Sequence, residues 1–372
     1  MKRIVVCILL IAALLSGCGL MRSSSYVVVT PHNEDYGVAL DSDVLTVSSY
    51  LSLKNALINA VEDRRDDFVI RAESYPGNLG EDLNQAVYEV SKMSPLGAYV
   101  VSSMTYDYSR IVSYYEINFN VSYKRSLEEI QQIVYVTDLS GIREKLEEAM
   151  ASYEPRLILR VGDYRAFDLA SEVENIFTSH PEFCMEMPET SMDLYPESGT
   201  QRILDIKFTY FHSPEELAAM RDEVETSVRR IVSVYGLSNS ELTNARRIYE
   251  RLGRNAGYIP QEDSRTASDG VYGALINGQA NSYGFAQAYC LLMQSCGIPC
   301  TIVSGQKGGA AHSWCLMDVD GTSCYVDPSL AADGDHMWFL LGTMELELNG
   351  YEIQNPEEYP FVELPWALRP SP

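Results

Sequence analysis

The stretch that decides the fold is 279-QANSYGFAQAYCLLMQSCGIP-299, which has a polar start and a long apolar centre. Apolar side chains lie almost all round the expected helix, a pattern typical of a helix buried on every side. Gly297 and Pro299 stop this helix. Ser282 stands in its first turn, where free N–H groups and the helix dipole favour a thiolate or the oxyanion of an acyl intermediate.

A hairpin is expected downstream of this helix. Asp320-Gly321 is a strong signal for a two-residue turn between two strands. With the turn centred there, Trp314 faces Asp327, and His312 is the diagonal neighbour of Asp327 on the same face. Diagonal side chains are about 7–8 Å apart at the backbone, within reach of a hydrogen bond between histidine and carboxylate. The spacing therefore places an imidazole beside a carboxylate that can orient it.

At these positions the sequence resembles the transglutaminase-like (papain-like cysteine protease) superfamily. The family pattern is cysteine, any residue, glycine, an aromatic residue and alanine at a helix start, then Gly-Ile-Pro, His-x-Trp, Asp-Gly and Tyr-x-x-Asp-Pro. The resemblance covers roughly residues 215–345 and implies an α+β domain in which a helix packs on an antiparallel sheet. It also implies that His312 is a base and Asp327 its orienter. The matching segments are Ser282–Ala286, Gly297–Pro299, His312–Trp314, Asp320-Gly321 and Tyr325–Pro328.

The nucleophile does not carry over, because Ser282 stands where the family has cysteine. Three interpretations stay open: Ser282 or Asn281 simply caps the helix, Ser282 is the nucleophile of a Ser–His–Asp site, or the site is inactive and its cleft binds a peptide or glycan. A helix end and an imidazole can hold a thiol, whose pKa is near 8.5, as thiolate. A serine hydroxyl instead needs proton removal during attack and tighter alignment. This difference favours the inactive, binding interpretation.

Several other side chains are candidates for lesser roles. Gln279 and Asn281 are candidate oxyanion donors, or simply turn residues, and Trp314 is a candidate cleft wall, or a core aromatic. No cofactor is expected, and no metal, since there is no CxxC motif and the cysteine spacing does not suggest zinc. The connectivity of the six cysteines outside the leader cannot be read from the sequence, and several are expected to be buried thiols: Cys184, Cys290, Cys296, Cys300, Cys315 and Cys324.

The N-terminus has the features of a bacterial lipoprotein signal. Lys2 and Arg3 precede the apolar run Ile4–Leu15, which is too short to span a bilayer comfortably, for which about 20 residues are needed. The tetrapeptide ending in Cys18 resembles the lipobox, in which cleavage precedes the cysteine and the cysteine carries the lipid; an ordinary secretory signal is the alternative. We expect a signal peptide at 1–17, a tether at 18–25 and an extracytoplasmic protein that is lipid-anchored to the bacterial cell membrane.

Between the tether and the C-terminal domain the sequence repeats itself. Leu57 and Tyr75 are matched 89 residues later by Leu146 and Tyr164, and a strand motif and later apolar positions follow the same spacing. Each unit has the pattern of helix, strand, helix and two strands. We therefore expect two small tandem α/β repeat modules, at 26–137 and 138–212, that act as spacers or binding surfaces, ahead of a transglutaminase-like domain at 213–372.

The formal net charge of −24 excludes nucleic acid and anionic lipid surfaces as direct partners. The expected partner is a protein or cell-wall peptide. It is the ligand of the cleft if the domain is inactive. In the alternative it is the substrate of a Ser–His–Asp acyl-transfer enzyme that hydrolyses or transamidates amides.

Overall fold

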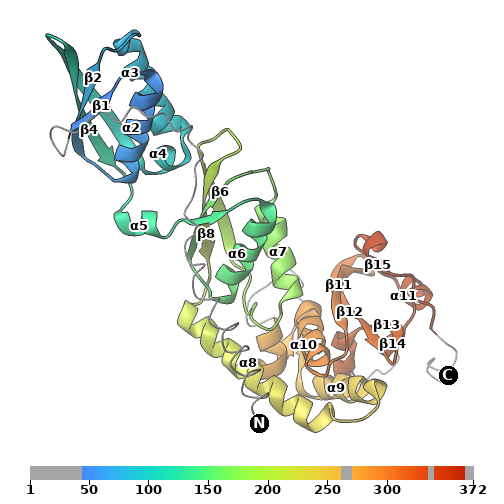
Figure 1. The fold of residues 1–372 in the computed structure, drawn as a ribbon. Helices are drawn as coiled ribbons and strands as arrows, with labels where there is room; N and C mark the ends of the chain where they lie inside the picture. The colour runs from blue at the N-terminus through green and yellow to red at the C-terminus, as the bar shows by residue number, and fades with distance from the viewer. Residues whose placement is uncertain (1–43, 261–269, 334–338, 365–372) are drawn as a thin grey trace, which may run out of the picture.

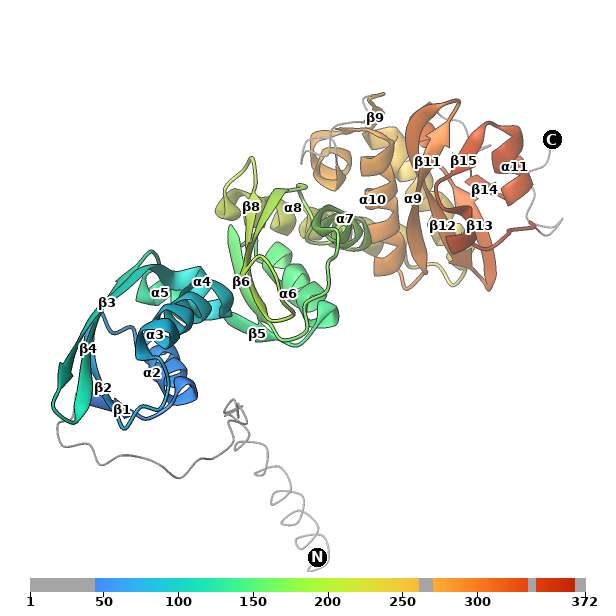
Figure 2. The ribbon, with the colours of Figure 1, turned by 90° about the horizontal axis from the view of Figure 1, so that it is seen from above.

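The computed structural model describes residues 44–260, 270–333 and 339–364. The expected signal peptide, Cys18 and the tether lie outside these ranges. Figures 1 and 2 show three bodies in a row: two sheet-and-helix units followed by a larger C-terminal body. Among the helices in the described ranges, none has both the length and the apolar character needed to cross a membrane.

The first unit is a four-stranded sheet with helices on one face. Its strands run in the order β1-β2-β4-β3, with β1 parallel to β2 and the other pairs antiparallel. The elements are β1 (Val44–Val47), α2 (Tyr50–Glu62), β2 (Asp67–Glu73), α3 (Leu79–Tyr88), a π-helix (Glu89–Met93), α4 (Pro95–Val100), β3 (Val101–Ile111) and β4 (Tyr114–Tyr123).

The second unit has the same strand order, β5-β6-β8-β7, again with one parallel pair, β5 with β6. Repeat-related positions occupy equivalent core sites, since Ile70 and Leu159, and Ile117 and Ile206, are all fully buried. The expected pattern lacked the first strand of each unit, β1 and β5. Strand β5 also lies before residue 138, where the second module was expected to begin. The elements, after α5 (Leu127–Gln131), are β5 (Val134–Val136), α6 (Leu139–Ala151), β6 (Arg156–Val161), α7 (Leu169–Ser179), β7 (Glu189–Tyr195) and β8 (Arg202–Thr209).

The C-terminal body packs helices against a five-stranded antiparallel sheet of order β14-β13-β12-β11-β15. Its helices are α8 (Pro214–Tyr235), α9 (Glu241–Asn255), a π-helix (Gly273–Asn277), α10 (Ser282–Ser295) and α11 (Thr343–Leu348). Its strands are β9 (Gly257–Tyr258), β10 (Gln279–Ala280), β11 (Cys300–Lys307), β12 (Ala310–Val319), β13 (Thr322–Val326), β14 (Phe339–Leu341) and β15 (Tyr351–Ile353). Short 3₁₀-helices cover Pro328–Asp333 and Pro356–Glu358.

Helix α10 lies in the centre of this body, as its apolar sequence predicts. Every residue from Ser282 to Met293 is buried. Tyr289 donates its hydroxyl to the Ala245 carbonyl of α9 (3.2 Å), and the Cys315 thiol of β12 donates to the Ala286 carbonyl (3.4 Å). The expected α+β class, with a helix packed on an antiparallel sheet, is therefore confirmed for the C-terminal body, and two mixed four-stranded sheets with helices precede it.

The expected hairpin is confirmed at the predicted register. Cys315 pairs with Val326 and Leu316 with Tyr325. Asp320 and Gly321 both have positive φ, 52° and 77°, as a two-residue turn with the twist of the flanking strands requires. This register is what places His312 and Asp327 on neighbouring strand ends.

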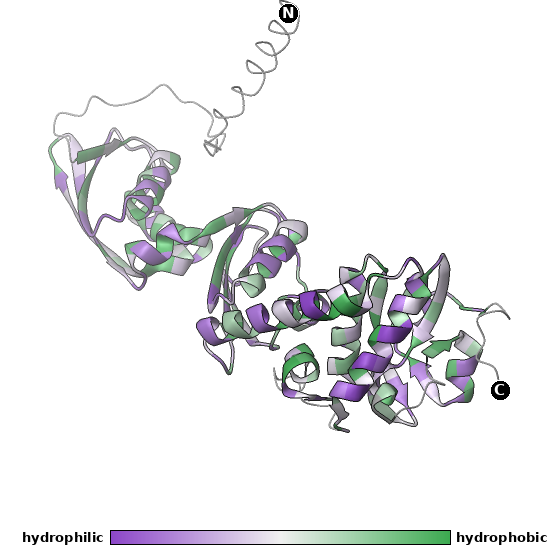
Figure 3. Cartoon of the chain, turned by 90° about the horizontal axis from the view of Figure 1, so that it is seen from below, coloured by the Kyte–Doolittle hydropathy of each residue, from purple (hydrophilic) through white to green (hydrophobic). Residues whose placement is uncertain are grey.

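Apolar packing connects each body to the next, through two hydrophobic cores. The apolar core of the first unit includes Ile158 and Ile203 from the second sheet, whose other face belongs to a core that continues into the C-terminal body. Phe177 of α7 stacks on Tyr283 of α10, with ring centroids 5.6 Å apart. Figure 3 shows hydrophilic and hydrophobic residues alternating along helices of all three bodies, the pattern of helices with one buried face. The second unit thus packs directly against the start of α10.

Candidate functional site

The N-terminus of α10 is capped by Asn281, whose side-chain oxygen accepts the N–H of Gly284 (2.9 Å). Ser282 is therefore the first residue of the helix rather than its cap. Gly278, at φ 76°, ends the preceding π-helix in the left-handed conformation that glycine tolerates best. Gln279 follows it, exposed, and pairs with Gly257 of β9. Roles for Gln279 and Asn281 toward an oxyanion stay predictions.

Ser282 is fully buried, and its hydroxyl oxygen accepts a hydrogen bond from the backbone N–H of Ser313 (3.0 Å). Ser313 follows His312 on β12, so this contact joins the start of α10 to the strand that carries the histidine. A buried N–H that lost this acceptor would cost about 1–3 kcal/mol. The serine hydroxyl thus has a structural task at the position of the expected nucleophile.

His312 and Asp327 form the pair that the hairpin spacing predicts. The imidazole Nε2 lies 2.7 Å from Asp327 Oδ2, and the two residues are 7% and 0% exposed. Aromatic rings surround the imidazole, with centroids at 5.9 Å for Tyr351, 6.3 Å for Trp314 and 6.4 Å for Tyr258. Because Asp327 engages Nε2, Nδ1 is the ring nitrogen that would accept a proton from a nucleophile.

Asp327 has further partners that the sequence did not reveal. Its Oδ2 also accepts the Tyr351 hydroxyl (2.6 Å), and its Oδ1 accepts the backbone N–H and hydroxyl of Ser329 (3.1 and 2.6 Å). The Lys307 ammonium lies 3.8 Å from Oδ2. Burial by itself raises the pKa of Asp327, but hydrogen bonds from His312, Ser329 and Tyr351 outweigh it and lower that pKa below its usual value. The carboxylate is therefore ionised at neutral pH.

These additional residues differ in how visible they are in the sequence. Ser329 follows Asp327 by two positions, the spacing of a local aspartate turn, and could have been found from that motif. Tyr351 and Lys307 have no such signal, since they reach the site through the pairing of β15 with β11. These two strands lie far apart in the sequence, and no periodic pattern predicts that they pair.

Trp314 is a core residue in this structure. It is fully buried, and its ring lies 5.0 Å from that of Tyr351 at 81°. A Cβ at Gly305 would come within 2.8 Å of the indole, so the glycine permits the close packing. Within the described residues the indole N–H has no hydrogen-bond partner. A role as a cleft wall stays a prediction.

The six cysteines in the described residues are free thiols, five of them buried and Cys296 half-buried. Burial raises the pKa of Cys300 and of Cys315. For Cys290, a hydrogen bond with Cys300 and then burial raise the thiol pKa. Neutral, buried thiols are poor nucleophiles, so none of these three substitutes for the missing cysteine. Among the described residues, no three His, Cys, Asp or Glu side chains are arranged to hold a metal ion.

Comparison with known proteins agrees with this architecture. Residues 230–339 match the family model of the transglutaminase-like superfamily, so the similarity lies in the C-terminal body. The family match ends before Tyr351, although this tyrosine donates to Asp327.

Three solved structures are similar at low sequence identity. One is a transglutaminase, at 10% identity and a TM-score of 0.27, covering 57% of this chain and 60% of that one. One is a protein from Parabacteroides distasonis named provisionally as a protease (11%, TM-score 0.25, 70% and 39% covered). The third is a protein from Cytophaga hutchinsonii named provisionally as a cysteine protease (14%, TM-score 0.27, 45% and 65% covered). The chain thus spans less than two thirds of each of them, and no curated protein matches it.

Proposed function

We propose that the transglutaminase-like domain is catalytically inactive and works by recognising a peptide or cell-wall ligand, as part of a lipid-anchored protein outside the bacterial cell membrane. The observation that carries the inactivity is the state of Ser282: the hydroxyl is fully buried and accepts the Ser313 N–H. A nucleophile must meet its substrate, and a fully buried hydroxyl is shielded from one.

The chemistry of the hydroxyl supports the same conclusion. The helix end and His312 can stabilise a thiolate, but a serine stays protonated until the moment of attack. Its proton must then pass to a base aligned with both serine and substrate. Serine at this position therefore lacks the ionised nucleophile that cysteine supplies, and it also needs a base in closer alignment.

Retention of His312 and Asp327 is compatible with an inactive domain. The carboxylate of Asp327 joins the end of β13 to β12, to β15 and to the turn at Ser329. Loss of Asp327 would leave several buried donors without an acceptor, each at a cost of about 1–3 kcal/mol. Their contribution to the stability of the fold is therefore sufficient reason for an inactive domain to contain both residues.

One observation favours the second candidate, a Ser–His–Asp acyl-transfer enzyme. The imidazole is already oriented by an ionised carboxylate at 2.7 Å, as a general base in such a site requires. In this chemistry the Ser282 hydroxyl would have to donate its proton to His312.

A transamidation assay separates the two candidates. The full-length chain is incubated with casein and dansylcadaverine, beside His312→Ala and Ser282→Cys. We expect the wild type to incorporate no more amine than His312→Ala. Incorporation by the wild type that His312→Ala abolishes would contradict the proposal. Incorporation gained only by Ser282→Cys would strengthen it, because it would identify the serine as the inactivating residue.

A further inference from the structure

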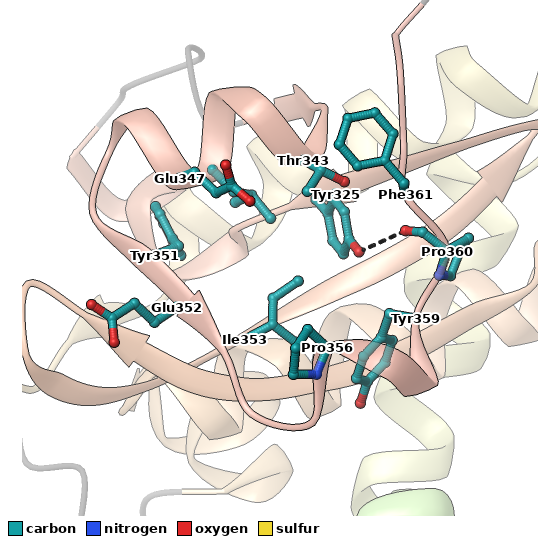
Figure 4. A pocket seen from close by; sticks show the side chains of 11 residues that line it. Tyr325, Thr343, Glu347, Tyr351, Glu352, Ile353, Pro356, Tyr359, Pro360 and Phe361 are labelled. Carbon is teal, nitrogen blue, oxygen red and sulfur yellow. Dashed lines mark hydrogen bonds between the residues drawn. The ribbon is translucent and has the colours of Figure 1, made fainter.

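A pocket lies in the C-terminal body beside α11. It has a volume of about 390 Å³ and lies between α11, β15 and the segment that follows β15, with Tyr325 of β13 in its wall (Figure 4). Ser282, His312 and Asp327 do not line it. Its volume is within the range of small-ligand pockets, about 300–1,000 Å³.

Hydrogen bonds fix the wall formed by the C-terminal segment. The backbone N–H of Thr343 donates to the Val362 carbonyl (2.9 Å), and the N–H of Val362 donates to the Thr343 hydroxyl (2.8 Å). The Tyr325 hydroxyl donates to the Pro360 carbonyl (3.3 Å), as Figure 4 shows. The pocket is therefore formed by connected elements rather than by a loop lying on the surface.

Aromatic rings make up much of the lining. Tyr325 and Tyr351 are buried at its base, Tyr359 is half-buried and Phe361 is 68% exposed. The Lys307 ammonium already lies over the Tyr351 ring, 4.8 Å from its centroid. Tyr359 and Phe361 are thus the rings that a ligand can meet from outside. The faces of such rings attract ammonium and guanidinium groups.

The two charged side chains that line the pocket are both acidic. Glu347 and Glu352 line it, and within the described residues neither forms an ion pair with Lys, Arg or His. The segment 343–363 carries six glutamates and no lysine or arginine, in a chain whose formal net charge is −24. These glutamates would repel an anionic ligand. They would attract a cation from a distance and form an ion pair with it once it is bound.

We propose that this pocket binds an ammonium group on an alkyl stem, as in a lysine side chain presented by a peptide or protein partner. The stem packs on Tyr359 and Phe361, the ammonium group meets the carboxylate of Glu347, and Glu352 adds further negative charge at the rim. The pocket shares Tyr351 with the His312–Asp327 site, but the residues proposed to bind the lysine side chain are different ones, so either proposal can fail while the other stands.

Two matched small molecules test the proposal on the full-length chain. N-acetyl-lysine amide carries the ammonium group, and its Nε-acetylated form is neutral and keeps the stem. We expect ligand-observed NMR titration to give a dissociation constant about tenfold lower for the cationic probe. Glu347→Gln with Glu352→Gln, and separately Phe361→Ala, should each weaken its binding about fivefold to tenfold. Glu197→Gln, an exposed change in the second unit, is the matched control and should have no effect.

Three results would overturn the proposal. Equal binding of the two probes would assign the pocket to a neutral apolar ligand. Binding that none of the pocket variants weakens would place the lysine site elsewhere, and no binding of the cationic probe would exclude the site. Glu347, Glu352 and Phe361 are all exposed, so their replacement should leave the thermal unfolding midpoint unchanged, and this midpoint confirms that each variant folds.

Discussion

Ser282 has a structural role at the position where a nucleophile is expected. Its hydroxyl accepts the N–H of Ser313 inside the protein, while Asn281 caps the helix. The hydroxyl thus satisfies a buried donor on the strand that carries His312. We expect its main effect to be on stability.

Ser282→Ala should lower the free energy of unfolding by about 1–3 kcal/mol, because it leaves the buried N–H of Ser313 without this acceptor. Urea denaturation measures the change. Ser295→Ala is the control in the same helix: its exposed hydroxyl donates to the carbonyl four residues earlier, and its loss should change stability by less than about 0.5 kcal/mol. Equal effects of the two changes would argue against a structural task for Ser282.

Asp327→Asn should be more costly, by at least about 3 kcal/mol. The carboxylate is fully buried and accepts from His312, Ser329 and Tyr351, whereas an amide offers one acceptor oxygen and directs its own N–H groups at these donors. Asp318→Asn, at an exposed position of β12, should be near neutral. Denaturation midpoints of the two variants, measured side by side at neutral pH, give the comparison.

The same carboxylate predicts a pH dependence. The pKa of Asp327 is lower in the folded protein than the usual value of about 3.9. The unfolded chain therefore binds the proton more readily, so this stabilisation is complete above about pH 4 and is lost as the pH falls through the folded-state pKa. The stability difference between wild type and Asp327→Asn should shrink as the pH falls from about 5 to 2. A difference that grew over this range would contradict the assignment.

At the scale of elements, the turn at Asp320-Gly321 sets the register that brings His312 to Asp327. Gly321→Ala should cost about 1 kcal/mol, because φ is 77° there and a Cβ would meet no atom within 4 Å, which leaves backbone strain as the cause. Asp320→Asn, in the same turn, should stay within about 0.5 kcal/mol, since asparagine also tolerates a positive φ. Thermal unfolding of both variants would show the contrast; a neutral Gly321→Ala would place the control of register elsewhere.

Local pattern was sufficient to predict these elements. The all-round apolar composition of α10 and the turn residues of the hairpin each lie within about twenty positions, so His312 and Asp327 could be paired from spacing alone. The strands β1 and β5 were missed because they are short: β1 has four residues and β5 has three. Tyr351 was missed because β15 reaches the site by pairing with β11, and no local sequence feature records such a contact.

At the scale of the whole molecule, an ion-pair network joins the first two units. The Arg156 guanidinium donates twice to the buried carboxylate of Asp205 (2.7 Å each), once to Glu129 (2.8 Å) and once to the Tyr99 hydroxyl of α4 (3.1 Å). Arg125, which precedes α5, also reaches Asp205 (3.3 Å). The network therefore connects the first unit, the linker and the second sheet.

Asp205→Asn should destabilise the protein by about 3–5 kcal/mol, because it removes the charge that compensates a partly buried guanidinium. It should also make the connection between the two units more sensitive to limited proteolysis. Asp193→Asn removes half of an exposed pair with Lys207 and should change neither property. Unchanged proteolysis in Asp205→Asn would show that apolar packing alone holds the units together.

Mapping of fluorophosphonate adducts tests the proposed inactivity of the domain most directly. The full-length chain is treated with a broad serine-reactive probe, digested and analysed by mass spectrometry beside His312→Ala. We expect no adduct on Ser282, because the hydroxyl is buried, accepts the Ser313 N–H and stays protonated. A stoichiometric adduct on Ser282 that disappears in His312→Ala would contradict this and establish a working Ser–His–Asp enzyme.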